Sequence, residues 1–117
     1  MSLIYETEHF TVESHEHPFV DRNEGGHIVI NPKTPIEDRT KLSPQLAKEF
    51  MKLTMVVGEA FPIAMKRNGI EISRVNYHDM GNRAPTFHVH LFGRVKDAKV
   101  HEYGEAVKLP PKATGFY

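Results

Sequence analysis

Most of the information about the fold lies in one stretch, PTFHVHLFGR, which runs from Pro85 to Arg94. Successive side chains of a β-strand point to opposite faces of the sheet, so alternate residues of this stretch share a surface. Thr86, His88 and His90 fall on one face, and apolar residues separate them. We therefore expect a strand over residues 86–95, with its apolar side packed against a helix.

Two imidazoles on one side of a strand suit three different uses. In nucleophilic catalysis, one neutral imidazole attacks phosphorus and forms a covalent intermediate, while the second donates to the phosphoryl oxygens. In metal binding, the His-x-His pair would need a third ligand, for which His78 and His27 are the candidates. In the third case, they are ordinary polar residues of a strand. The motif alone leaves all three open.

A long amphipathic helix precedes this strand in the sequence. Apolar residues spaced three or four apart form its stripe: Leu46, Phe50, Leu53, Val57, Ala60 and Ala64. Ser43 suits the N-cap, Pro44 suits the first helical position, and Asn68-Gly69 supplies the stop. The ring of Pro62 would clash with the carbonyl of Gly58, so we expect a kink or break there.

Short strands are expected on both sides of the helix, over residues 3–6, 10–13, 27–30 and 70–77. Segments rich in proline, glycine and asparagine predict loops over residues 14–26, 32–41 and 78–85. The tail from about residue 96 should be mostly irregular. This order of elements predicts a single α+β domain over residues 1–117, with a mainly antiparallel sheet.

Composition narrows the range of functions. Lys plus Arg and Asp plus Glu number 15 each, so no strongly basic surface favours long nucleic acid. Cysteine is absent, which excludes disulfides, thiol catalysis and cysteine-based zinc sites. No signal peptide or membrane span is evident, because the longest helical segment carries charges throughout. We expect a cytoplasmic protein that does not bind membranes.

The 85–94 stretch resembles the signature of the histidine triad superfamily, in which three histidines alternate with apolar residues and an arginine closes the strand. Matching both flanks places the middle histidine, which is the family's nucleophile, at His88 and the third at His90. The first position then holds Thr86, a departure from the pattern. A second register, with His90 as nucleophile and Phe92 third, loses both flanks.

Other segments resemble the same family. Residues 25–33 are similar to its first long strand, which runs from a glycine-histidine pair into a proline-lysine turn. Val75-Asn76 and the Gly/Asn turn after it resemble the segment leading into the triad. The resemblance covers about Gly25 to Arg94. The family often has a histidine shortly after the proline-lysine turn, where this chain has Pro35.

The resemblance implies a role for each site residue. His88 would attack the α-phosphorus of a nucleotide conjugate, with its other ring nitrogen donating to a backbone carbonyl. His90 would contact a phosphoryl oxygen or the leaving group. Asn76, Asn82 and Thr86 would bind substrate. Several residues stay outside this site: Arg83 and Arg94 as solvated charges, His27 as a structural strand histidine, and His9, His15, His17, His78 and His101 as histidines without a matching role.

These residues predict an enzyme that hydrolyses or transfers nucleotides from phosphoramidates or dinucleoside polyphosphates, through a nucleotidyl-histidine intermediate. It would need no cofactor and no metal. One alternative is a non-catalytic nucleotide-binding module, and another is a metal-binding protein that uses the His-x-His strand. The family resemblance also predicts a homodimer formed through the helix and an adjoining strand, and the apolar strip of Met51, Met55 and Val56 is compatible with that.

Overall fold

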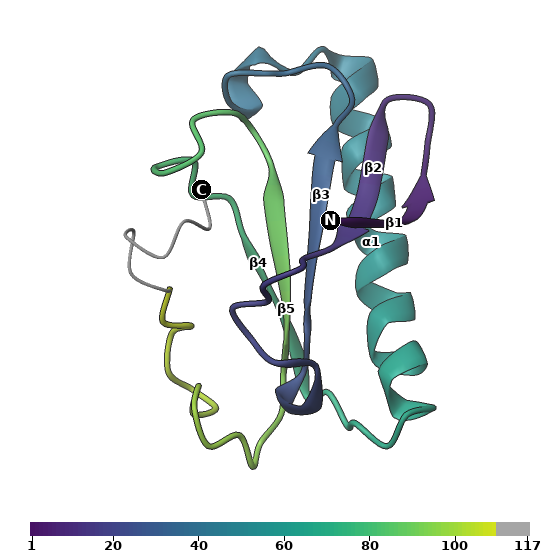
Figure 1. Ribbon diagram of the computed structural model, residues 1–117. Helices are drawn as coiled ribbons and strands as arrows, with labels where there is room; N and C mark the ends of the chain where they lie inside the picture. The colour runs from purple at the N-terminus through teal and green to yellow at the C-terminus, as the bar shows by residue number, and fades with distance from the viewer. Residues whose placement is uncertain (110–117) are drawn as a thin grey trace.

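The computed structural model describes residues 1–109, which form one antiparallel sheet with a single long helix against it (Figure 1). The strands are β1 (Ser2–Glu6), β2 (Phe10–Ser14), β3 (His27–Pro32), β4 (Arg74–His78) and β5 (Val89–Arg94). Their order in the sheet is β1-β2-β3-β5-β4, and every neighbouring pair is antiparallel. The α+β class expected from the sequence is confirmed.

Helix α1 (Pro44–Lys66) begins as its sequence predicts, because the Oγ of Ser43 accepts a hydrogen bond from the N–H of Leu46. The expected break at Pro62 was wrong, since α1 continues through it for another turn. Phe61, beside the proline, is buried in the core, and Met65 packs against that core. Burying a phenylalanine contributes about 1.5–3 kcal/mol, which is comparable with the roughly 3 kcal/mol that an internal proline costs.

The strand ends also differ from the expectation. β4 begins at Arg74, four residues later than predicted, and β5 begins at Val89, so Thr86 and His88 lie before the strand. The cause is a change of partner: the N–H of Phe87 donates to the carbonyl of Ile36, in the loop after β3. Two short 3-10 helices interrupt loops, η1 (Arg22–Glu24) and η2 (Arg39–Lys41).

The core divides between the two faces of the sheet. Against α1 lies the larger cluster, which includes Phe87, Val89 and Leu91 as the alternation predicted. The opposite face carries His27, Val29, Asn76, His78, His90 and Phe92, which are cross-strand neighbours in β3, β5 and β4. A second apolar cluster covers this face and contains Phe19, Val20, Phe92 and Val107. One face of β5 therefore packs against α1, and the other carries His90 and Phe92 under the second apolar cluster.

Two glycines bring the end of β5 close to the start of β3. Gly25 has a φ of 133°, and a Cβ placed on it would lie 1.9 Å from the carbonyl oxygen of Gly93. The N–H of Gly93 donates to the carbonyl of Gly26 at 3.1 Å. This backbone contact sets the register that places His27 opposite Phe92.

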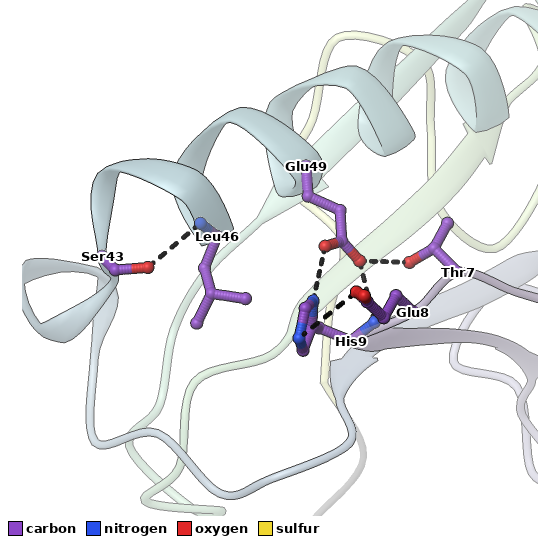
Figure 2. A network of polar contacts seen from close by, with 6 residues as sticks. All are labelled: Thr7, Glu8, His9, Ser43, Leu46 and Glu49. Atoms are coloured by element: carbon purple, nitrogen blue, oxygen red, sulfur yellow. Dashed lines mark hydrogen bonds and ion pairs between the residues drawn. The ribbon is translucent and has the colours of Figure 1, made fainter.

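The turn between β1 and β2 is attached to α1 by one carboxylate (Figure 2). Glu49 accepts hydrogen bonds from the Thr7 hydroxyl at 2.6 Å and from the N–H of His9 at 2.9 Å, and its other oxygen lies 2.8 Å from His9 Nδ1. This last hydrogen bond raises the pKa of His9 above its usual value. His9, which the sequence left without a role, therefore has a structural one in holding this turn against α1.

The tail after β5 contains neither helix nor strand over residues 95–109, which agrees with the irregular structure expected for it. It is nevertheless attached to the body of the protein. The carboxylate of Glu24 accepts hydrogen bonds from the N–H groups of Lys99 and Val100, at 2.8 and 3.2 Å. Within residues 1–109, no helix is long and apolar enough to cross a bilayer.

Candidate active site

The histidine rings gather on the face of the sheet that points away from α1, over its central strands β3 and β5. The rings of His88 and His90 lie 4.8 Å apart, centroid to centroid, and are nearly perpendicular. His27 lies beside His90, with ring centroids 5.0 Å apart, and His15 stacks on His27 at 4.9 Å. The ring of Phe19 packs against both His27 and His90. The result is a compact and largely buried imidazole cluster.

The proton of His88 can be assigned from one contact. Its Nδ1 lies 2.7 Å from the carbonyl oxygen of Thr86, and a carbonyl can only accept a hydrogen bond. Nδ1 therefore carries the proton, and in the neutral ring Nε2 has a free lone pair. This is the hydrogen bond that the resemblance led us to expect of His88, and in the neutral ring it leaves Nε2 unprotonated.

The proton of His90 can be assigned in the same way, starting from a backbone N–H. The N–H of Phe19 donates to Nδ1 of His27 at 3.1 Å, so the proton of neutral His27 lies on Nε2. That Nε2 lies 2.8 Å from Nδ1 of His90, which must then accept. His90 therefore carries its own proton on Nε2. His88 and His90 thus present one free acceptor, Nε2 of His88, and one donor, the Nε2–H of His90.

His27 and His90, which are joined by a hydrogen bond, both stay neutral over a wide range of pH. Burial, together with the neighbouring imidazoles, lowers the pKa of His27 to about 2 and that of His90 to about 3. The contacts explain why: an added proton would sit on Nδ1 of either ring, where it would face a hydrogen-bond donor. Desolvation also lowers the pKa of His15 and of His78.

Asn76 lies on the same face, and a buried arginine holds its amide. The Oδ1 of Asn76 accepts from Nη1 of Arg94 at 2.7 Å, which leaves the amide N–H groups as donors. Arg94 is 4% exposed and also donates to the carbonyls of Glu102 and Glu105, at 2.9 and 2.7 Å. The interpretation of Arg94 as a solvated charge was wrong, because it clamps the tail to β4.

The two other proposed substrate-binding residues are less closely placed. Asn82 and Thr86 are exposed in the turn between β4 and β5. The structure brings the carbonyl of Thr86 to His88, but no described contact joins the side chains of Asn82 or Thr86 to the imidazole cluster. Arg83 belongs to the same turn and is partly buried.

Two hollows border Asn76. One, of about 640 Å³, runs along β4 and is also lined by His78 and Pro62. The other, of about 460 Å³, lies between β4 and the tail, with Arg74 and Tyr103 in its wall. Neither is lined by His88 among the described residues, and that side chain is only 8% exposed.

The metal-binding alternative needed a third ligand beside His88 and His90. Across residues 1–109, no three His, Asp or Glu side chains are grouped as metal ligands would be. Nε2 of His27, one of the two candidates for that ligand, instead forms the hydrogen bond to His90. The donor set of this face therefore suits a relay of hydrogen bonds better than a metal centre.

Sequence reasoning missed two functional contacts of the cluster. His101 is buried at 7% exposure, and its Nε2 lies 2.8 Å from the carbonyl oxygen of Phe19. Phe19, in turn, supplies the N–H that orients His27. Both contacts use backbone groups of Phe19, which every residue type supplies, so no motif signals them. The one available sign was the apolar pair Phe19-Val20 inside an otherwise polar loop.

The fold and the cluster define an α+β domain whose histidines line the central strands of an antiparallel sheet. Comparison with known families gives a match between the HIT domain and residues 1–97. The chain therefore belongs to the HIT domain family, whose name refers to the histidine triad. No curated protein gives a significant sequence match.

Solved structures agree in fold. A HIT family member from Bacillus subtilis is 22% identical with a TM-score of 0.65, over 82% of this chain and 65% of that one. A hypothetical histidine triad nucleotide-binding protein from Sulfolobus tokodaii is 19% identical, with a TM-score of 0.65 over 95% and 73%. A HIT family hydrolase from Legionella pneumophila is 12% identical, with a TM-score of 0.55 over 85% and 83%. The chain thus spans less than two thirds of the Bacillus protein.

Proposed function

We propose that this protein cleaves a phosphorus-linked nucleotide conjugate, either a nucleoside phosphoramidate or a dinucleoside polyphosphate, by way of a nucleotidyl-His88 intermediate. The observation that carries the proposal is the complementary protonation of the two rings. Nε2 of His88 has a free lone pair, whereas Nε2 of His90 carries a proton. The solved relatives described as nucleotide-binding and as a hydrolase are consistent with this chemistry.

In the first step, Nε2 of His88 attacks the α-phosphorus, and the bond from phosphorus to the leaving group breaks. The ring becomes an imidazolium, whose Nδ1–H remains on the Thr86 carbonyl and is stabilised there. In the second step, water attacks the same phosphorus and releases His88. The water's hydroxyl stays on phosphorus, and its proton is released to solvent, where it replaces the proton that the leaving group takes up as it departs. A nucleoside monophosphate is the product.

Negative charge increases on the phosphoryl oxygens in each transition state, and a preformed donor stabilises it. The Nε2–H of His90 is such a donor, because the relay through His27 prevents the opposite tautomer. The amide N–H groups of Asn76 supply further donors. Since His88 is largely buried, we expect the turn that carries Asn82 and Thr86 to shift when substrate binds.

Intact-mass spectrometry tests the proposal directly. The protein is mixed with a dinucleoside polyphosphate, quenched, and examined for an added nucleotidyl mass. We expect the adduct in the wild type and in His9→Ala, which removes a histidine from the turn between β1 and β2, but not in His88→Ala. Circular dichroism checks that the variants fold. An adduct or undiminished turnover in His88→Ala would contradict the proposal.

The same experiment separates the enzyme from a non-catalytic binding module. A non-catalytic module would bind nucleoside monophosphate, as measured by calorimetry, but would neither form the adduct nor release product.

We also predict a homodimer, because the strip of Met51, Met55 and Val56 is more than half exposed in the single chain. Light scattering tests this prediction. A mass equal to one chain would refute the homodimer and would leave the proposed catalytic mechanism unaffected.

A further inference from the structure

A continuous chain of hydrogen bonds connects the tail to the imidazole cluster. The N–H of Lys108 donates to Nδ1 of His101 at 3.1 Å, and Nε2 of His101 lies 2.8 Å from the carbonyl oxygen of Phe19. The N–H of Phe19 lies 3.1 Å from Nδ1 of His27, whose Nε2 lies 2.8 Å from His90. One peptide residue, Phe19, therefore links a histidine of the tail to the histidines of the sheet.

Every bond in this chain has a fixed direction. A backbone N–H can only donate and a carbonyl can only accept, so His101 accepts at Nδ1 and donates at Nε2. The same reasoning fixes His27 and then His90 in the Nε2–H form. If the Phe19 N–H moved away, His27 could carry its proton on Nδ1 instead. His90 would then donate to His27 and would lose the donor that faces the substrate.

The contacts around Phe19 show what holds its peptide in place. The loop over residues 15–21, which contains Phe19, has neither helix nor strand of its own. Its carbonyl is bound by His101, and its ring packs with Val107 of the tail in the apolar cluster over Phe92. The tail has an independent attachment, because Glu24 binds the N–H groups of Lys99 and Val100. Changing His101 therefore removes one contact of the loop without releasing the whole tail.

We propose that His101 is a positioning residue for His90: by binding the carbonyl of Phe19, it keeps the Phe19 N–H on His27 and thereby the proton of His90 on Nε2. The tail thus acts on the phosphoryl-facing donor without touching substrate. The effect on turnover rests on the proposed function, whereas the protonation pattern does not.

A matched pair of substitutions at one position tests this role. His101→Leu removes the donor to the Phe19 carbonyl. His101→Gln keeps an N–H donor near the position of the imidazole Nε2 and an oxygen that can accept. Nitrogen-15 NMR of the histidine rings distinguishes the two tautomers without any substrate. Steady-state kinetics on a dinucleoside polyphosphate then separates kcat from KM.

In the wild type, NMR should show the proton on Nε2 of His27, His90 and His101, and on Nδ1 of His88. In His101→Leu, the Nδ1–H form of His90 should become detectable, and kcat should fall roughly tenfold, at the low end of what losing an outer hydrogen-bond partner costs a ligating histidine. KM should change little, because the donor acts in the transition state. His101→Gln should restore both signals.

Three results would overturn the proposal: a wild-type His90 protonated on Nδ1, an unchanged tautomer and kcat in His101→Leu, or equal losses in the Leu and Gln variants. Because the first is measured on the wild-type protein, failure of a variant to fold does not remove the test. If the wild type turns over no conjugate, the proposed function fails, and the NMR result still decides whether His101 sets the tautomer.

Discussion

Mild acid should destabilise this protein through two buried histidines. In the unfolded chain, His27 and His90 take up protons near pH 6.5, whereas in the folded state their pKa values are about 2 and about 3. Between about pH 3 and 6.5 the unfolded state therefore binds more protons, so stability falls as the pH drops through this window. The loss begins at the unfolded pKa and continues until the folded groups titrate.

The size of the effect follows from the width of that interval. At pH 5, each histidine lies about 1.5 pH units below its unfolded pKa, which corresponds to about 2 kcal/mol. The two together should remove about 4 kcal/mol, a large part of the roughly 5–15 kcal/mol that stabilises a typical domain. His9 acts in the opposite direction, because its folded pKa is raised, but it is too exposed to compensate.

Urea unfolding, followed by circular dichroism at several pH values between 7 and 5, measures the free energy of unfolding directly. The variant His27→Gln removes one of the two titrating groups, so its stability should depend less steeply on pH, by up to about 1.4 kcal/mol per pH unit. Gln45→Asn, which replaces an exposed residue that does not titrate, is the control and should keep the wild-type slope. A stability that stays constant within about 1 kcal/mol from pH 7 to pH 5 would refute the reasoning.

Three further predictions concern the contacts that hold the site. Arg94→Met should lower the free energy of unfolding by about 3 kcal/mol, because charge-assisted hydrogen bonds contribute roughly 1.5–3 kcal/mol each and some acceptors regain water. Urea unfolding measures this loss. An equal loss in Arg74→Met, which replaces an exposed arginine, would count against the role of Arg94 in holding the tail. Gly25→Ala should cost roughly 3 kcal/mol from backbone overlap, clearly more than Gly81→Ala, which shares a positive φ but meets open space; equal costs would show that only φ matters. Glu49→Gln should lower Tm by about 3–5 °C, through loss of charge-assisted hydrogen bonds to the β1–β2 turn, and an unchanged melting curve would contradict that attachment.

Features that depend on local sequence were predictable. The stripe of α1, its N-cap at Ser43 and the alternation of Phe87, Val89 and Leu91 follow from the periods of helix and strand. The helix does not break at Pro62, because the clash that the proline causes is a local effect, whereas the packing of Phe61 that keeps α1 intact is a tertiary one. Local rules therefore set the elements, and burial decided where one of them ended.

The imidazole pair was predictable as a pair, and the hydrogen bond from His88 to a backbone carbonyl followed from its expected chemistry. The protonation of His90 was not, because it depends on His27 and on the N–H of Phe19, which lie 63 and 71 positions earlier in the chain. Arg94 was misread for a related reason: its partners are carbonyls of the tail, which every sequence possesses. Backbone partners leave no trace in a sequence pattern.

Because neighbouring positions of β5 serve opposite faces, this strand can accept substitutions far more readily than a change of length. An extra residue between Val89 and His90 would turn every later side chain over, moving Leu91 to the face that carries the histidines and Phe92 to the face packed against α1. Folding and chemistry would then fail together rather than one at a time. Variation in length among related chains should accordingly be confined to the turns on either side of β5.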